Sequence, residues 1–138
     1  MAIEKKFLEK FIRATEFGAY GAFPFIGKGD KSAADRGAVD KMRNILNKID
    51  MKATIVIGEG EMDKAPMLNI GEKVGNNNGP EFDIAVDPLE GTTFTSKGLP
   101  NAFSVLAVTE KGNLLSAPDT YMEKIIIGAN LPKNLLDL

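Results

Sequence analysis

The sequence contains the run Phe82-Asp83-Ile84-Ala85-Val86-Asp87-Pro88-Leu89-Glu90-Gly91-Thr92, in which an apolar strand is followed by two carboxylates, a glycine and a hydroxyl. Alternating burial explains the apolar residues of this run but not Asp87 and Glu90. We expect these two acids to converge where the backbone turns at Pro88 and Gly91. Because neighbouring carboxylates repel each other unless a cation lies between them, the run predicts a site for metal and phosphate.

The rest of the chain supplies the elements around this run. Helical spacing of apolar residues predicts two helices, over residues 3–23 and 32–49. The turn Glu110-Lys111-Gly112-Asn113 predicts a hairpin between strands 103–108 and 114–115. We therefore expect an α/β protein of α+β layers, in which the two N-terminal helices pack on a mixed sheet. The β-branched and apolar runs predict strands at 53–57, 82–86, 103–108, 114–115 and 122–127.

The composition limits the possible partners. The chain has 138 residues, with 17 Lys and Arg against 19 Asp and Glu, so its net charge is −2. No cluster of basic and aromatic residues occurs, which argues against a nucleic-acid partner. No apolar run reaches the roughly 20 residues that a membrane helix requires, and the start of the chain lacks a signal peptide. We expect a cytoplasmic protein that does not enter a membrane.

Two residue types are missing, and their absence limits the chemistry. The chain has no histidine and no cysteine. This excludes zinc sites of the Cys/His kind and nucleophilic mechanisms of the Ser-His-Asp or Cys-His kind. Any bound metal must have oxygen ligands, which favours the hard cations Mg²⁺, Mn²⁺ or Ca²⁺.

Four acids lie where an element meets a turn, namely Asp35, Glu59, Asp87 and Glu90. Strand ends of an α/β sheet commonly face one crevice, so Glu59 and Asp87 share a space if their strands are neighbours. Such a set could bind two divalent ions, which activate a water and stabilise the leaving oxygen in phosphoryl transfer. The backbone N–H groups after Glu90 would face the phosphate at the start of a short helix.

Each of these residues also has a structural explanation. Ser32 and Asp35 fit a capping box, so Asp35 could simply cap a helix. Glu59 could be a solvated loop acid, and Asp87 could bond its own backbone in an ordinary turn. Tyr121 is of a type that most often packs in a core with its hydroxyl at the surface. The functional interpretation therefore depends on the joint occurrence of several acids next to glycines.

Six segments, in order along nearly the whole chain, together closely resemble class II fructose-1,6-bisphosphatase, of the lithium-sensitive, metal-dependent phosphatases. That superfamily carries the signature Asp-Pro-x-Asp-Gly-Thr/Ser, which this chain matches with Glu90 as the second acid. The resemblance implies that the chain forms the N-terminal part of the αβαβα sandwich of the sugar phosphatases. The segments are Gly27–Asp35, Thr54–Glu61, Ala65–Leu68, Ile70–Gly75, Asp83–Thr92 and Ala117–Lys124.

The resemblance also implies roles for individual residues. Glu59, Asp87 and Glu90 would be metal ligands, joined by the backbone carbonyl of Leu89, and Asp35 would serve the catalytic metal. The metal would be Mg²⁺ or Mn²⁺. Asp35 and the Thr92 hydroxyl would orient and deprotonate the attacking water. The implied catalytic residues are Asp35, Glu59 and Thr92, and the implied substrate-binding residues are Lys31, Glu90, Gly91, Thr92 and Tyr121.

The implied reaction is hydrolysis of fructose 1,6-bisphosphate to fructose 6-phosphate and phosphate, in gluconeogenesis. Alternatives are sedoheptulose-1,7-bisphosphatase, an inositol-monophosphatase-like enzyme, and an inactive fragment that binds metal or assembles with a partner. Family members continue beyond Leu138, so we expect residues 1–138 to be the N-terminal metal-binding and catalytic domain without the C-terminal domain. We expect weak or no bisphosphatase activity from this chain alone. Uncovered sheet edges favour a homo-oligomer.

Overall fold

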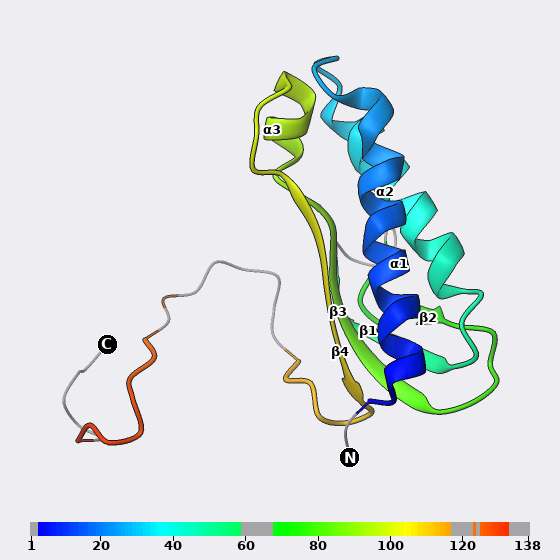
Figure 1. The fold of residues 1–138 in the computed structure, drawn as a ribbon, viewed down its shortest axis with the longest axis vertical. Coiled ribbons are helices and arrows are strands. Elements are labelled where there is room, and N and C mark those ends of the chain that lie inside the picture. Colours follow the sequence, from blue (N-terminus) through cyan, green and yellow to red (C-terminus); the bar gives the residue numbers. More distant parts are fainter. Residues whose placement is uncertain (1–2, 59–67, 117–122, 124, 133–138) are drawn as a thin grey trace.

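The computed structural model describes residues 3–58, 68–116, 123 and 125–132 (Figure 1). Within these residues, helices α1 (Lys5–Ala22) and α2 (Lys31–Leu46) cover one face of a four-stranded sheet. The short 3₁₀ helix η1 (Phe23–Phe25) follows α1, and helix α3 (Thr92–Lys97) follows the third strand. The expected fold class, two N-terminal helices on a mixed sheet, is confirmed. None of the described helices has the length and apolar character needed to cross a membrane.

The sheet places the two central strands side by side in the same direction. Its order is β2-β1-β3-β4, and β1 and β3 are parallel whereas the outer pairs are antiparallel. Both central strands therefore run toward the end of the molecule that holds α3 (Figure 1). The strands are β1 (Lys52–Ile57), β2 (Lys73–Val74), β3 (Glu81–Glu90) and β4 (Phe103–Glu110).

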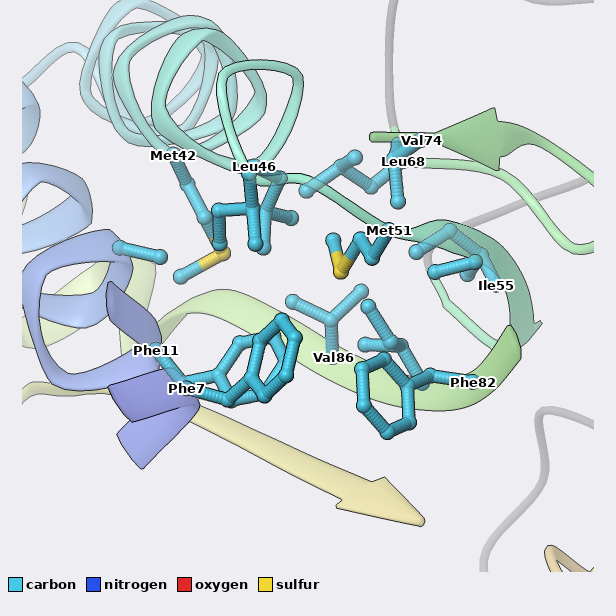
Figure 2. Close-up of a cluster of buried hydrophobic side chains, with 14 of the residues drawn as sticks. Phe7, Phe11, Met42, Leu46, Met51, Ile55, Leu68, Val74, Phe82 and Val86 are labelled. Carbon is cyan, nitrogen blue, oxygen red and sulfur yellow. The ribbon is translucent and has the colours of Figure 1, made fainter. Parts of the chain in front are cut away.

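The main core lies between the helices and the sheet. On α1, buried Phe7 and Phe11 are four residues apart and face the sheet, as an amphipathic helix requires. Both rings meet Phe82 of β3 edge-on, with centroids 5.2 and 5.9 Å away. Figure 2 shows these three rings beside the aliphatic and thioether side chains of the same cluster. The cluster also contains Met42, Leu46, Met51, Ile55, Leu68, Val74, Ile84 and Val86.

The two long helices touch backbone to backbone at one point. A Cβ atom on Gly21 of α1 would collide with the backbone carbonyl of Gly37 in α2, and the reverse substitution would collide with the carbonyl of Gly21. Only glycine lets two helices approach this closely. The contact holds the end of α1 against the first half of α2, next to the connection between them.

The second helix differs from its prediction at both ends. It begins at Lys31 and ends at Leu46, rather than spanning 32–49. Ile49 fits the apolar spacing because its side chain is buried, but it reaches the core from the turn that follows the helix. Periodicity therefore identified the buried positions correctly and extended the helix too far.

Two predicted strands are absent from the described residues. The 114–115 segment is not in a strand and forms no hairpin with β4, which pairs with β3 on its inner edge. Residues 123 and 125–127 are likewise not in a strand, while Met122 and Lys124 lie outside the described residues. Ile126 is 94% exposed, and the β-branched residues around it pair with no neighbouring strand. Strand propensity depends on such a partner, which explains the wrong predictions.

Candidate functional site

The start of α2 is capped by a residue that the sequence pattern did not indicate. The Asp30 carboxylate accepts a hydrogen bond of 2.9 Å from the backbone N–H of Ala33, so Asp30 is the N-cap. The predicted alternative of a capping box between Ser32 and Asp35 is therefore wrong. Both of these residues lie inside the helix, three positions apart, where side chains share one face.

Side chains of α2 and α3 line a common hollow of about 300 Å³. Lys31, Ser32 and Asp35 come from the beginning of α2, and Thr92 is the first residue of α3. Asp35 and Thr92 are half-buried, whereas Lys31 is exposed. The hollow thus combines an ammonium group, two hydroxyls and a carboxylate, a set that suits a phosphate ester and an attacking water.

The glycine-rich connection between α1 and α2 holds α3 in place. The backbone N–H of Gly27 donates to the carbonyl of Thr95 at 2.9 Å, and that of Gly29 donates to the carbonyl of Ser96 at 2.8 Å. Gly91 precedes α3 with a left-handed φ of 86°, a conformation that glycine adopts without strain. These contacts fix Thr92 against the first turns of α2.

The end of β3 departs from the predicted turn at Pro88. The strand continues through Pro88 to Glu90, and its register against β4 shifts between Asp87 and Glu90. Three steps along β3 match two steps along β4, because Asp87 pairs with Val105 and Glu90 with Phe103. The strand therefore contains a bulge of one extra residue, a position in which proline is tolerated because it needs no ladder hydrogen bond.

The bulge decides which way the two acids face. In a regular strand, residues three apart point to opposite faces of the sheet. Asp87 and Glu90 instead lie opposite Val105 and Phe103, which are two residues apart and share one face. The extra residue therefore brings both carboxylates to the face of the sheet opposite the long helices.

Two further residues of this segment have clear contacts. Asp87 Oδ1 accepts a hydrogen bond of 3.1 Å from the backbone N–H of Leu89. This is the local backbone bond that the structural explanation of Asp87 predicted. Its carboxylate has further lone pairs for other partners. The Leu89 side chain is buried against Ala34 and Ala38 of α2, on either side of Asp35 in the sequence. This packing ties the end of β3 to the part of α2 that carries Asp35.

The predicted site residues are only partly brought together. Lys31, Asp35 and Thr92 share the hollow, but nowhere in the described parts of the chain do three or more acidic side chains form a group able to hold a metal ion. Glu59 and Tyr121 lie outside the described residues. Strands β1 and β3 are neighbours and parallel, with Ile57 opposite Ala85, which meets the condition stated for Glu59 and Asp87. The donors Asp35, Asp87 and Glu90 offer oxygen only, which fits Mg²⁺ or Mn²⁺.

Sequence reasoning missed Ser32 as a residue of the site. It was assigned to helix capping, yet its side chain lines the hollow beside Lys31 and Asp35. Its spacing of three from Asp35 in a predicted helix was the signal that both side chains share a face.

The chain is similar to known phosphatases over nearly its whole length. A family model described as bacterial fructose-1,6-bisphosphatase, glpX-encoded, matches residues 5–138. The chain is 54% identical over 129 residues to fructose-1,6-bisphosphatase 1 class 2 of Escherichia coli strain K12, covering 94% of this chain. It has the same identity and coverage with fructose-1,6-bisphosphatase class 2 of Haemophilus influenzae. The chain spans 38% of the length of each of these relatives.

The fold is also found among solved structures. An extragenic suppressor protein from Pyrococcus furiosus superposes with a TM-score of 0.52 at 20% sequence identity. The match covers 78% of this chain and 41% of that protein. At this identity the likeness concerns the fold alone, and it supports the layered arrangement of helices on a mixed sheet.

Proposed function

Because the chain belongs to the family of glpX-encoded bacterial fructose-1,6-bisphosphatases, we propose that it forms the metal- and phosphate-binding part of a sugar bisphosphatase. The reaction is hydrolysis of fructose 1,6-bisphosphate to fructose 6-phosphate and phosphate. The observation that carries this proposal is the hollow in which Asp35, Thr92 and Lys31 meet. The family resemblance implied that these three residues belong to one site, although Thr92 is far from the other two along the chain.

The acids and one backbone carbonyl are proposed to hold the metal. Asp35, Glu59, Asp87 and Glu90 would be the side-chain ligands, with the carbonyl of Leu89 as a further oxygen donor. When bound, Mg²⁺ or Mn²⁺ would neutralise phosphoryl charge and lower the pKa of a water. The bulge supports the pairing of Asp87 with Glu90, because it aligns these two carboxylates on one face of the sheet.

The remaining residues are proposed to act on the substrate and the water. Asp35 accepts the proton of the attacking water, and the Thr92 hydroxyl orients that water. Glu59 is the third proposed catalytic residue. The Lys31 ammonium group lies in the same hollow as Asp35 and Thr92, where its charge would attract a phosphate ester. The proposed substrate-binding residues are Lys31, Glu90, Gly91, Thr92 and Tyr121.

The wider setting follows from the proposed reaction. Removal of a phosphate from fructose 1,6-bisphosphate is a step of gluconeogenesis and of growth on glycerol, and we place the protein in the cytoplasm. The substrate is a sugar bisphosphate, with neither a nucleic acid nor a membrane as partner. The family names support a phosphatase.

The substitution Glu59→Gln tests the metal assignment. The change keeps the shape of the side chain and removes its charge. We expect the affinity for Mn²⁺ to fall at least about tenfold, because losing a group that only hydrogen-bonds to a metal ligand already lowers metal affinity by that much. Binding is measured from the electron paramagnetic resonance signal of free Mn²⁺, and folding from circular dichroism, which should not change. Glu9→Gln, at an exposed position of α1, is the matched control. Unchanged Mn²⁺ affinity in Glu59→Gln would show that the assignment is wrong.

A second function, self-assembly, is favoured by the exposed face of the sheet. Phe103 and Val105 are 57% and 43% exposed, on the face that also carries Asp87 and Glu90. Exposed apolar patches of this kind commonly mark contact surfaces. The occupant we propose is a second copy of this chain, in a homo-oligomer, as an alternative to the metal site because such a copy would cover Asp87 and Glu90.

Sedimentation velocity tests this assembly. We expect the chain to sediment as an oligomer at micromolar concentration, and Val105→Lys to shift it toward the monomer because a charge on this face opposes burial. Lys111→Gln, in the exposed turn that follows β4, should leave the distribution of monomer and oligomer unchanged. A monomer at all concentrations contradicts the assembly, whereas an oligomer that Val105→Lys shifts toward the monomer supports it.

A further inference from the structure

Another pocket, of about 240 Å³, lies at the opposite end of the sheet from the hollow around Asp35. Its lining includes Lys52 and Glu81, the first residues of β1 and β3, whereas α3 and the hollow follow the last residue of β3. A strand of ten residues, such as β3, is about 30 Å long, so no small ligand can touch both places. Lys73 of β2 and Lys111, in the turn after β4, also line this lysine pocket.

The register of the strands brings the side chains of the lysine pocket to one face. Phe82 of β3 is buried in the core under the helices, so Glu81, one residue earlier, points to the opposite face of the sheet. Lys52 is the β1 partner of Glu81 and therefore shares that face. Thr54 follows two residues after Lys52, and its β2 partner is Lys73. The sheet itself thus gathers these side chains away from the helices.

The positive charges in the lysine pocket outnumber the negative ones. Lys111 Nζ donates to Glu81 Oε2 at 3.0 Å, and Lys73 Nζ donates to Thr54 Oγ1 at 2.7 Å. The hydrogen bond from Lys111, and then its charge, lower the pKa of the Glu81 carboxyl, and the charges of Lys52 and Lys73 lower it further. All three ammonium groups therefore act on one small region, in which Glu81 is the single acid of the lining.

The next acid along this face of β3 does not change that balance. Asp83 is buried, and its Oδ2 accepts a hydrogen bond of 2.7 Å from the backbone N–H of Gly112. It serves the turn after β4 and does not line the pocket. Even when its charge is included, the three lysines exceed the two acids.

A purely structural explanation covers only part of the lysine cluster. Lysine on an outer strand prevents pairing with another sheet, which explains Lys73 on β2. The ion pair with Glu81 explains Lys111. Neither reason applies to Lys52, which lies on a central strand and has no hydrogen bond or ion pair to its ammonium group within the described residues. Three lysines from three separate segments are better explained by an anion that contacts all of them.

We propose that Lys52, Lys73 and Lys111 form a binding site for a phosphate dianion, free or as a monoester, separate from the proposed active site. Each ammonium group has three N–H donors, so the bonds to Glu81 and Thr54 leave donors for phosphate oxygens. Lysine binds phosphate as a point charge and needs no fixed orientation. The pocket is smaller than the roughly 300 Å³ at which sites for drug-sized ligands begin, which favours a small anion over a nucleotide.

The test follows backbone amide signals of the whole ¹⁵N-labelled chain by NMR while sodium phosphate is added at about pH 8. Ionic strength is held low and constant with sodium chloride, because salt screens exposed charges. We expect saturable shifts at Lys52, Thr54, Lys73 and Lys111. Shifts at Lys31 would report the hollow separately, so this site and the proposed function can fail independently.

Substitutions of opposite charge should change the affinity in opposite directions. Lys52→Gln and Lys73→Gln should each raise the dissociation constant for phosphate about two- to fivefold, the range for an exposed charge pair. Glu81→Gln removes the one acid of the lining and should lower the dissociation constant by a similar factor. If the lysines served only to balance Glu81, this last variant would bind no better than the unmodified chain. Lys41→Gln, at an exposed position of α2, is the matched control and should change nothing.

The proposal is overturned if phosphate causes no saturable shifts at the lysine pocket. It is also overturned if the double variant of Lys52→Gln with Lys73→Gln, shown by circular dichroism to be folded, binds phosphate as tightly as the unmodified chain. A second titration with methyl phosphate distinguishes the two forms of the ligand. Binding of inorganic phosphate alone identifies free phosphate, and tighter binding of methyl phosphate identifies a monoester; either result, with the expected variant effects, supports the site.

Discussion

Asp35→Asn is expected to lower metal-dependent phosphate release from fructose 1,6-bisphosphate by at least about 100-fold, the typical contribution of a residue that transfers a proton in the rate-determining step. The substitution keeps the shape of the side chain but removes the charge that accepts the proton of water. It also removes a proposed ligand. Because Asp35 lies in the hollow with Thr92 and Lys31, the loss should concern the chemical step more than the folding of α2.

The measurement requires high sensitivity, because the chain spans 38% of the length of its relatives. Radiolabelled substrate and protein in excess over substrate report a single turnover, with and without Mn²⁺. Glu9→Gln is the control, since it removes one carboxylate charge at an exposed position of α1. Equal rates for Asp35→Asn and the unmodified chain, in the presence of metal-dependent release, would remove Asp35 from the mechanism.

Gly21→Ala is expected to lower the free energy of unfolding by about 3 kcal/mol, at the upper end of the usual cost of overpacking. In a free helix the same change is favourable by up to about 1 kcal/mol, so the expected sign depends entirely on the crossing of α1 and α2. The added Cβ would collide with the backbone carbonyl of Gly37, which cannot rotate away as a flexible side chain can. The helices would have to separate.

Chemical denaturation followed by circular dichroism measures this loss. Glu16→Ala, at an exposed position of the same helix, should change the free energy of unfolding by no more than about 0.5 kcal/mol. If Gly21→Ala is as stable as the unmodified chain, the helices do not cross as closely as described. Separation of the helices should also weaken Mn²⁺ binding, because Asp35 lies in α2 near the crossing.

Periodicity in the sequence was sufficient to predict the elements with strong local signals. The two N-terminal helices and the strands at 53–57, 82–86 and 103–108 occur where they were expected, because alternation and helical spacing mark buried faces directly. The condition placed on Glu59 and Asp87, neighbouring strands, was also met. The order of the strands was not predictable, since pairing depends on partners far apart in the sequence.

The failures have identifiable physical causes. The start of α2 was missed because Asp30, rather than Ser32, satisfies the free backbone N–H groups of its first turn. The segment at 125–127 was predicted as a strand from composition, but strands also require a partner edge. Arg43 of α2 forms an ion pair with Glu72, 29 positions away along the chain, and no local pattern reports such a contact. The course of β3 through Pro88 was missed because proline normally ends a strand.

The extra residue in β3 has a consequence for engineering and for divergence between relatives. Asp87 and Glu90 are three residues apart and share a face only because β3 has one more residue between them than β4 has between their partners, Val105 and Phe103. Removing one of the two residues between the acids would give a regular ladder with the acids two positions apart, so both carboxylates would stay on the same face. Grafting this acidic pair onto another sheet at its native spacing of three residues therefore requires copying the irregularity of the backbone, whereas a regular strand needs a spacing of two.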